Sequence, residues 1–496
     1  MMQRYGWGIV ISWLLMSAAV AQPTRPWQGA VEVGGLSAFG NQTPYWLRTN
    51  QYGTVPQTGN VATVRAEWQR DYRRDSTTRK QPRRVDWGAG LRAVLNVGSP
   101  HTTYDPALLL PDAYLKIRLS GLELYAGNRR EVVGIGDTLL TSGFMAWSGN
   151  AMPFPKVQLH TPNYIPIGFT KGWLAVRAGY AHGWLINTYI QGSYLHQKYL
   201  YGRVGKPGGR WHVAGGINHQ VQWAGQANYL RGTDLAVDGR LPSAFSDYLS
   251  MITGRYPNAL QNDRFTGFDG TNRIGNHLGT YDLSVDYRSR RASWLLYHQH
   301  YYEDASGLAL QNLPDGLTGL RWQRGTGSRA RFQLQRVLVE WLTTMNQSGS
   351  QFDPAARYQG ADNYFDHSQY REGWSYRGKT LGTPLIAPRG TFVTSINDTY
   401  TGGGYFPNNR LSAWHAGLIG AFRKGPTLTL RLTYSRNYGT YIQPYPAPFR
   451  QFSGAASARW ALPKRPDVSL LATLAVDRGE LYPNSVGSFL SLQKRW

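Results

Sequence analysis

The chain has 496 residues, no Cys, and 53 Lys and Arg against 29 Asp and Glu, which gives a formal net charge of +24. The absence of Cys excludes a disulfide framework, a thiolate metal site, a Cys nucleophile and a lipid-modified N-terminal Cys. Aromatic residues make up 13% of the chain, too many for a disordered protein, and the basic balance leaves nucleic acid, an anionic membrane or an acidic polymer as partner classes.

Residues 1–21 have the pattern of a secretory signal peptide. Arg4 is the basic start, a short apolar run follows, and Ala19 and Ala21 are the small residues expected before a cleavage site. The alternative is a buried N-terminal helix. Because no later run of about 18 apolar residues occurs, helices are not expected to span a bilayer. The mature chain, 22–496, is therefore expected to be secreted, periplasmic or an outer-membrane β-barrel.

Apolar and polar residues alternate along Val85–Val97, so that Trp87 and Leu91 share an apolar face while the other face is polar or Gly. At about 3.3 Å per residue this strand is about 43 Å long, longer than most strands of soluble domains. A two-residue turn at Ser120-Gly121 joins two further alternating segments into a hairpin. About fifteen to nineteen such segments recur, which predicts an all-β fold.

Aromatic residues mark the ends of the predicted strands, as in the girdles that membrane barrels place at the two membrane–water boundaries. The chain ends on Trp496, which resembles the C-terminal signature of bacterial outer-membrane barrels. A water-soluble β-sandwich or propeller is the alternative. The long strands and the lack of a blade-like repeat favour one transmembrane antiparallel β-barrel over residues 22–496. The girdle candidates include Trp68, Trp87, Trp173, Trp294, Trp414, Tyr434 and Trp460.

Two segments interrupt the β pattern and are expected to be non-barrel insertions. Residues near 241–257 have helical apolar spacing, with Ser243 as N-cap and Gly254 as C-cap, and this helix is expected in the lumen or at the periplasmic rim. Residues 129–168 are rich in Pro and Gly and are expected to form a constriction or plug.

A series of short motifs along most of the mature chain resembles the family of outer-membrane capsule assembly proteins called Wzi, and is closest to its Bacteroidetes-type branch. The motifs are Thr43-Pro44-Tyr45-Trp46-Leu47, Asn50-Gln51-Tyr52-Gly53, Ala126-Gly127-Asn128-Arg129-Arg130-Glu131, Ser148-Gly149-Asn150-Ala151-Met152-Pro153, Leu195-His196-Gln197-Lys198-Tyr199, Gly216-Ile217-Asn218-His219, Gly275-Asn276-His277, Tyr302-Glu303-Asp304-Ala305-Ser306-Gly307-Leu308, Asp362-Asn363-Tyr364-Phe365, Gly373-Trp374-Ser375-Tyr376, Gly382-Thr383-Pro384-Leu385 and Asp477-Arg478-Gly479-Glu480-Leu481-Tyr482. The sequence departs from the family where Ala224-Gly225 replaces a Gly pair and where Tyr45 replaces a frequent Phe.

The resemblance implies a barrel of about 18 antiparallel strands with a helical element closing the periplasmic side. It also implies a lectin-like role, in which the protein binds capsular polysaccharide or exopolysaccharide at the surface of a Gram-negative cell and helps to assemble or attach the capsule. Loss of the protein is then expected to leave the polysaccharide synthesised but shed. An outer-membrane pore for solutes or oligosaccharides is the alternative function.

Basic and aromatic residues of two segments are the candidate polysaccharide contacts, because Arg pairs with carboxylates and aromatic faces stack on sugar rings. The alternative is that they are solvated loop charges and girdle aromatics. The candidates are Tyr201, Arg203, Arg210 and Trp211 in the first segment, and Tyr370, Arg371, Trp374 and Arg377 in the second.

A second group of polar residues is expected to form ion pairs and hydrogen bonds between the plug and the inner wall, since buried charges in a lumen must be paired. A glycan-binding lumen is the alternative. The group comprises Asn128, Arg129, Arg130, Glu131, His196, Lys198, Asn218, His219, Glu303 and Asp304.

Catalysis and nucleic-acid binding are not expected. Glu303, Asp304 and Asp315 could offer two carboxylates for glycoside hydrolysis, but adjacent strand residues such as Glu303 and Asp304 point to opposite faces, which disfavours their acting as a pair. No GxSxG or HExxH pattern stands out. The basic residues form no recognisable nucleic-acid module. The expected partners are an anionic polysaccharide and outer-membrane lipid or lipopolysaccharide, with no cofactor, no metal and a monomeric state.

Overall fold

The computed structural model describes residues 27–40, 42–73, 85–98, 106–257, 259–325, 330–353, 358 and 360–496, so the predicted signal peptide at 1–21 lies outside the described residues. Within these ranges the long strands form one nineteen-stranded sheet. Its strands are β1 Trp27–Phe39, β2 Val61–Arg70, β3 Val85–Val97, β4 Leu108–Leu119, β5 Leu122–Asn128, β6 Lys156–His160, β7 Ile165–Pro166, β8 Leu174–Leu185, β9 Ser193–Val204, β10 Trp211–Trp223, β11 Asn276–Arg288, β12 Ala292–Tyr302, β13 Gly316–Arg324, β14 Phe332–Thr343, β17 Leu411–Phe422, β18 Thr427–Gly439, β19 Pro444–Leu462, β20 Arg465–Gly479 and β21 Ser485–Arg495. A separate short hairpin pairs β15 Ser375–Tyr376 with β16 Lys379–Thr380. The helices are α1 Tyr45–Arg48, α2 Phe245–Thr253, α3 Gly267–Thr271, α4 Ala305–Leu308 and α5 Thr394–Thr399, with 3-10 turns η1 Gly168–Thr170, η2 Asn228–Leu230 and η3 Thr401–Gly403.

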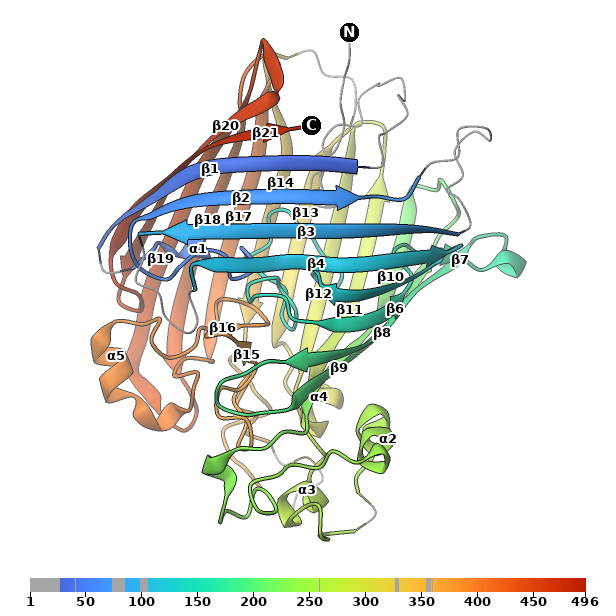
Figure 1. Cartoon of the computed structure of the whole chain (residues 1–496), viewed down its shortest axis with the longest axis vertical. Helices are drawn as coiled ribbons and strands as arrows, with labels where there is room; N and C mark the ends of the chain where they lie inside the picture. Colours follow the sequence, from blue (N-terminus) through green and yellow to red (C-terminus); the bar gives the residue numbers. More distant parts are fainter. Residues whose placement is uncertain are drawn as a thin grey trace.

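The large sheet closes into an antiparallel barrel of 18 strands (Figure 1). Each wall strand pairs with the next along the chain, and β21 returns to pair with β1, where Val33 lies opposite Leu492. The nineteenth strand, β7, continues the broken wall strand begun by β6, because both pair with β8. The predicted transmembrane antiparallel barrel of about 18 strands is confirmed. The predicted hairpin at Ser120-Gly121 is also present, with Leu119 opposite Leu122.

The wall is apolar on its outer face and polar on its inner face. Along β3 the outward side chains of Trp87 and Leu91 are 47% and 49% exposed, whereas the alternating Asp86 and Asn96 are buried. A water-soluble protein has the opposite arrangement. Exposed apolar side chains around a closed wall are stable where the surrounding medium is lipid rather than water.

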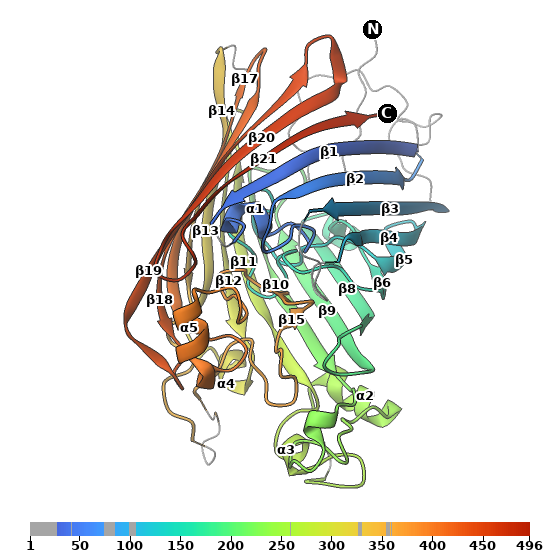
Figure 2. The same cartoon turned by 60° about the vertical axis from the view of Figure 1, so that its left-hand side comes forward.

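The two ends of the barrel differ in the length of their connections. At the terminal end, where β1 begins and β21 ends, most connections are short, such as 120–121, 289–291 and 463–464. At the opposite end, the loop end, the connections include 129–155, 224–275 and 344–410. Figures 1 and 2 show the α-helices α2 to α5 gathered at the loop end. Outer-membrane barrels have short periplasmic turns and long extracellular loops, so the loop end faces outward from the cell.

The helix α2 lies against the outside of the wall, not in the lumen. The Tyr248 ring packs 5.3 Å from the Trp223 ring, and the Tyr248 hydroxyl hydrogen-bonds the hydroxyl of Tyr180 on the outer face of β8. The prediction that this helix lies in the lumen or at the periplasmic rim is therefore wrong. In the part of the chain that the structure describes, the α-helices α2 to α5 lie at the loop end and do not close the terminal end. Gly254 caps the helix as predicted, with a φ of 66°, whereas the N-cap is Ala244 and not the predicted Ser243. Among the described residues, no helix is long and apolar enough to cross a bilayer.

Three segments enter the barrel and together form a plug: residues 42–60, 129–155 and 360–392. Their buried apolar side chains, such as Trp46, Phe144 and Trp374, belong to one cluster that also contains inward-facing wall residues. The predicted insertion at 129–168 is too long at its C-terminal side, because β6 and β7 are wall strands.

Buried carboxylates attach the plug to the wall at several strands. Glu340 on β14 accepts hydrogen bonds from the Thr141 hydroxyl at 2.7 Å and from the Ser142 amide at 2.6 Å. Asp137 of the plug pairs with Arg336 of β14 at 2.8 Å, and Asp477 of β20 accepts the Tyr45 amide at 2.7 Å. Charge-assisted bonds to buried groups are strong, and a partner left unpaired is costly. The plug is therefore fixed to the wall rather than loosely contained by it.

Replacing Glu340 with Ala is expected to loosen the plug without opening the barrel. The substitution removes the acceptor for Thr141, Ser142 and Tyr297, and each buried donor left unpaired costs about 1–3 kcal/mol. Limited proteolysis of the folded protein should then cleave within 129–155, while the faster electrophoretic migration of the unboiled barrel is retained. Asp263→Ala is the control, since that side chain is 87% exposed. Equal cleavage in both variants would contradict the anchoring role.

The loop that contains Asp366 is expected to be more stable at acidic pH. Burial raises the pKa of Asp366 to about 7, above about 4 in an unfolded chain, so its stabilisation is complete below about pH 4 and is lost as the pH rises through 7. Hydrogen-exchange protection of the Tyr405 and Phe406 amides, which bond this carboxyl, should fall between pH 5 and pH 8 after correction for intrinsic rates.

Asp366→Asn should flatten that pH dependence, because the amide stays neutral across the range. Asp398→Asn, at an exposed position in α5, should leave it unchanged. A D366N profile identical to that of the wild type would show that another group is responsible.

Candidate functional site

An exposed cation over two aromatic rings stands out at the loop end. The Arg371 guanidinium carbon lies 5.0 Å from the Tyr229 ring centroid and 5.6 Å from that of Tyr189. Tyr229 is held in place by its hydroxyl, which donates to the Gln369 carbonyl at 2.8 Å. Arg371 is exposed, whereas both rings are largely packed against neighbours. The two packed rings therefore hold the Arg371 guanidinium at the surface through cation–π contacts.

Sequence reasoning identified Arg371 but missed Tyr189 and Tyr229. These rings come from the 186–192 and 224–275 connections, far from Arg371 in the sequence, and no local pattern links the three. Only the clustering of loops at one end of a barrel brings them together.

The other candidates of the same segment have mainly structural contacts. Tyr370 is 1% exposed and its hydroxyl donates to the Ala224 carbonyl at 3.1 Å. Trp374 is fully buried and its indole N–H donates to the Ala146 carbonyl at 2.9 Å. Arg377 is half-buried, with its guanidinium carbon 5.7 Å from the Tyr376 ring centroid. Tyr370 and Trp374 thus hold the plug, and Arg371 and Arg377 are the members of this segment that solvent reaches.

The candidates of the earlier segment lie away from the loop end. Tyr201 is buried on the inner face of β9, where its hydroxyl donates to Asp282 at 3.1 Å. Arg203 lies near the terminal end of the same strand, and Arg210 and Trp211 lie at or beside the connection 205–210. The structure therefore does not bring these four residues together with Arg371.

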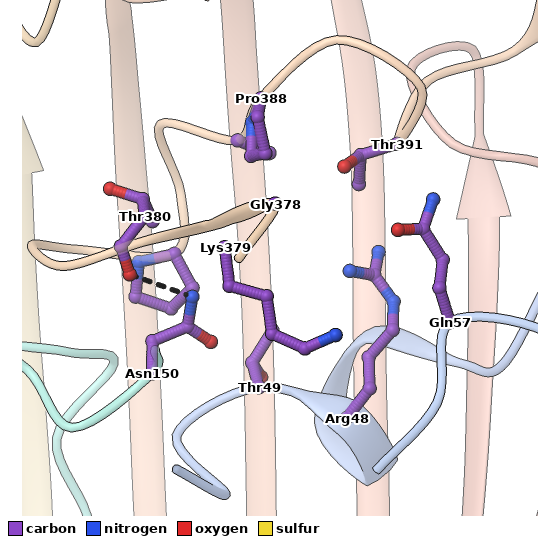
Figure 3. Close-up of a pocket in the computed structure, with 11 residues that line it drawn as sticks. Arg48, Thr49, Gln57, Asn150, Gly378, Lys379, Thr380, Pro388 and Thr391 are labelled. Atoms are coloured by element: carbon purple, nitrogen blue, oxygen red, sulfur yellow. Dashed lines mark hydrogen bonds between the residues drawn. The ribbon is translucent and has the colours of Figure 1, made fainter. Parts of the chain in front are cut away.

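A small polar pocket lies within the plug, between α1 and the segment around β16 (Figure 3). The Arg48 guanidinium and the Lys379 ammonium both point into it, beside Asn150, whose amide donates to the Thr380 carbonyl at 3.1 Å. Arg48 also donates through Nε to the Thr43 carbonyl at 3.0 Å. The cavity measures about 20 Å³, enough for about one water and too small for a sugar ring.

The residues that follow β5 form ion pairs inside the barrel. Arg129 pairs with Glu123 at 2.5 Å, Arg130 with Asp112 at 2.6 Å, and Glu131 with Lys156 at 2.6 Å. Each pair joins the start of the 129–155 plug segment to the inner wall. Asn128 closes the end of β5, donating to the Leu110 carbonyl at 3.3 Å, and Asn218 is buried on the inner face of β10.

Three residues expected in the lumenal network, His196, Lys198 and His219, lie on the outer face of the wall instead. His196 and Lys198 lie an even number of positions from the exposed Leu200 on β9, and His219 from the exposed Trp211 on β10, so all three share the outward face. The prediction was wrong because the sequence does not indicate which polar residues of a strand end lie beneath an external helix. Here α2 covers this face, and the Lys198 ammonium donates to the Ile252 carbonyl at its C-terminal end.

The carboxylates considered for catalysis are engaged in holding loops. Glu303 accepts the Phe365 amide at 2.9 Å and the Tyr301 hydroxyl at 3.1 Å, and burial raises the pKa of Glu303 well above its ordinary value. Asp304 precedes α4 as its N-cap residue. Asp315 accepts the Gln347 amide at 2.7 Å. Within the described residues, no group of three or more His, Asp or Glu is placed to hold a metal ion.

Comparison with known proteins agrees with this architecture. The Wzi of Escherichia coli, an outer-membrane protein involved in group 1 capsule assembly and described as a carbohydrate-binding β-barrel, is 14% identical. The alignment covers 93% of this chain and 83% of that one with a TM-score of 0.56, which supports the fold. OccAB4 of Acinetobacter baumannii is 8% identical over 95% of this chain and 97% of its own, with a TM-score of 0.47 that is too low for an argument.

No curated protein shows significant sequence similarity to the chain. The family model of the capsule assembly protein Wzi, however, matches residues 21–386. Because that match spans most of the chain, the protein belongs to the Wzi family of capsule assembly proteins and is an outer-membrane β-barrel of a Gram-negative bacterium.

Proposed function

We propose that this chain binds an anionic capsular polysaccharide or exopolysaccharide at its loop end and helps to attach it to the cell surface. The observation that carries the proposal is the exposed Arg371 guanidinium supported by Tyr189 and Tyr229. A guanidinium pairs with a carboxylate through two parallel hydrogen bonds, and the cation–π contacts with Tyr189 and Tyr229 hold the Arg371 guanidinium in position for that pairing. The cluster lies at the end of the barrel with the long loops.

The charge of the whole chain supports an acidic polymer as the ligand. A net charge of +24 attracts a polyanion over about a Debye length, which is about 8 Å at physiological salt. Inside the barrel, arginines such as Arg129 and Arg130 are paired with carboxylates, so they are not available for an external ligand. Arg371, which is exposed, and Arg377, which is half-buried, remain as the candidate contacts of the 360–392 segment.

The plug distinguishes this proposal from a solute channel. Buried side chains from 42–60, 129–155 and 360–392 pack in the barrel interior and are bonded to several wall strands. A channel needs a continuous aqueous path, whereas a binding protein needs only an accessible outer surface. The same arrangement supports a non-catalytic role, because Glu303 is held by the Phe365 amide of the plug and Asp315 by the Gln347 amide of the 344–410 connection.

Removing the exposed cluster is expected to weaken glycan binding about tenfold, which corresponds to about 1.4 kcal/mol. The test uses Arg371→Ala with Tyr229→Ala in a pull-down with polysaccharide from the producing organism, at low and at high salt. Wild-type retention should fall as salt rises, because the attraction is electrostatic.

Arg290→Ala with Arg291→Ala is the matched control, since both are exposed cations on the terminal-end turn 289–291. It removes more charge than the test variant but should retain the glycan. Equal retention by all three proteins would overturn the assignment of the cluster.

Reconstituted in a planar bilayer, the wild-type protein is expected to give no large steady current, because the plug occupies the lumen. A variant lacking 134–150, confirmed as a folded barrel by its unboiled migration, should conduct and serves as the positive control. Large steady wild-type currents would favour the channel function instead.

A further inference from the structure

A cavity of about 530 Å³ lies on the outside of the wall, between strands β9 to β12 and the connection 224–275. Its wall side includes Leu200 and Ile217, and its loop side includes Thr253, Gly254 and Arg273. The inner plug plays no part in forming this face. The cavity therefore differs in place from the glycan-contact cluster around Arg371 and from the small pocket within the plug.

The position of the cavity along the wall corresponds to the outer edge of the membrane. On β10 the outward Trp211 is 62% exposed and marks the girdle at the terminal end. His219, which lines the cavity, lies eight positions further along the same strand, about 26 Å at about 3.3 Å per residue. With a strand tilt of about 40°, this is about 20 Å along the membrane normal, close to the far boundary of an apolar band about 25 Å tall. The cavity is thus at the level of the lipid headgroups in the outer leaflet.

The helix that covers the cavity also has the character of an element lying in a membrane interface. On α2, Phe245 and Leu249 are 75% and 47% exposed, while Met251 is fully buried in a cluster that includes Trp223 on the wall. Two large apolar side chains on the free side of a short helix are costly in water but favourable at the level of the acyl chains.

The lining of the cavity is divided between apolar and cationic groups. Leu200 and Ile217 continue the lipid-facing surface of the wall into the cavity, whereas Lys198 and Arg273 place two cations at its loop side. His219 donates or accepts a 3.0 Å bond with His277, and its other ring nitrogen, which is buried, has no hydrogen-bond partner among the described residues. An amphiphile with an anionic head fits this division.

Two features of the lining bear on an anionic ligand. Lys198 donates to the Ile252 carbonyl, and Arg273 donates through Nε to the Gly254 carbonyl at 2.8 Å, so both also hold the C-terminal end of α2. An ammonium has three donors and a guanidinium five, so each retains donors for a ligand. Glu303 also lines the cavity, but burial raises its pKa well above the ordinary value, which reduces its repulsion of an anion.

We propose that this cavity binds the phosphorylated headgroup of an outer-leaflet lipid, with Lys198 and Arg273 facing the phosphate and the acyl chains lying along Leu200 and Ile217. The bound lipid fills the space between the wall and α2 and ties the 224–275 connection to the membrane surface. This assignment does not depend on the polysaccharide proposed for the loop end.

The test is lipid retention by the full-length protein, measured by native mass spectrometry after reconstitution with bisphosphorylated lipid A or with the same lipid after removal of its phosphates. The wild type should retain one phosphorylated lipid, and Lys198→Met with Arg273→Met should reduce retention at least tenfold. Arg290→Met with Arg291→Met is the matched control and should retain the lipid as the wild type does.

Leu200→Trp provides a second variant that fills the apolar side and keeps both cations. It should also lose the lipid, and hydrogen exchange of the α2 amides in the absence of lipid should match that of the wild type, so that loss of the helix is not the cause. Glycan retention should be unchanged in both cavity variants, which separates this proposal from the one above.

Equal retention of phosphorylated and dephosphorylated lipid would overturn the role of the headgroup. Equal retention by the wild type and both cavity variants would overturn the site. Equally tight binding of the soluble, deacylated phosphosugar would overturn the assignment to a lipid, because the proposal requires the acyl chains to contribute.

Discussion

Every backbone amide of a wall that faces lipid must find its hydrogen-bond partner within the protein, because the bilayer core contains no water to replace it. The pairing of β21 with β1, with Val33 opposite Leu492, meets this requirement by removing both free edges of the sheet. The broken wall strand follows the same rule, since β6 and β7 both pair with β8. Once the sheet is closed, alternate residues of every strand face either lipid or the interior.

The closed wall encloses an interior that must be filled by side chains whose hydrogen bonds and charges are paired with one another. The plug does this with apolar packing at its centre and with charged contacts at its edges. There Glu340 of the wall accepts the Ser142 amide of the plug, and Asp137 of the plug pairs with Arg336 of the wall. Buried charges at such contacts are stable only when paired, so the plug and wall determine each other's position. An interior held in this way leaves the loops of one end as the surface that meets other molecules.

The outer face of the wall is less uniform than the strand pattern suggests. Near the loop end of β8 to β12, the outward side chains are polar or aromatic, such as Lys198, His219 and Trp223. Nearer the terminal end of the same strands, the outward side chains are mainly apolar. The polar and aromatic side chains are tolerated because α2 covers them and accepts the hydrogen bond of Lys198. The protein thus has a lipid-facing wall, a filled interior and an external covered patch, each with its own chemistry.

Much of the wall could be predicted from the sequence, because alternate side chains of a strand face different environments and therefore alternate between apolar and polar residues. Val85–Val97 and the hairpin at Ser120-Gly121 were correct to the residue, and the family resemblance was correct in its strand number. The cap at Gly254 was also correct, since helix ends carry local signals. The side of the wall on which that helix packs was not predictable, because both sides of a barrel rim accept an amphipathic helix.

The sequence by itself determined the closed β architecture, the apolar and polar faces of the strands and the membership of the family, because these depend on period-two patterns and ordered motifs. The tertiary structure alone decided which residues meet. It separated Tyr201 from Arg371 by placing them at different levels of the barrel, and it brought Tyr189 and Tyr229 under Arg371 from distant connections. Loop conformation is set by contacts between residues far apart in the chain, and such contacts leave no periodic trace in the sequence.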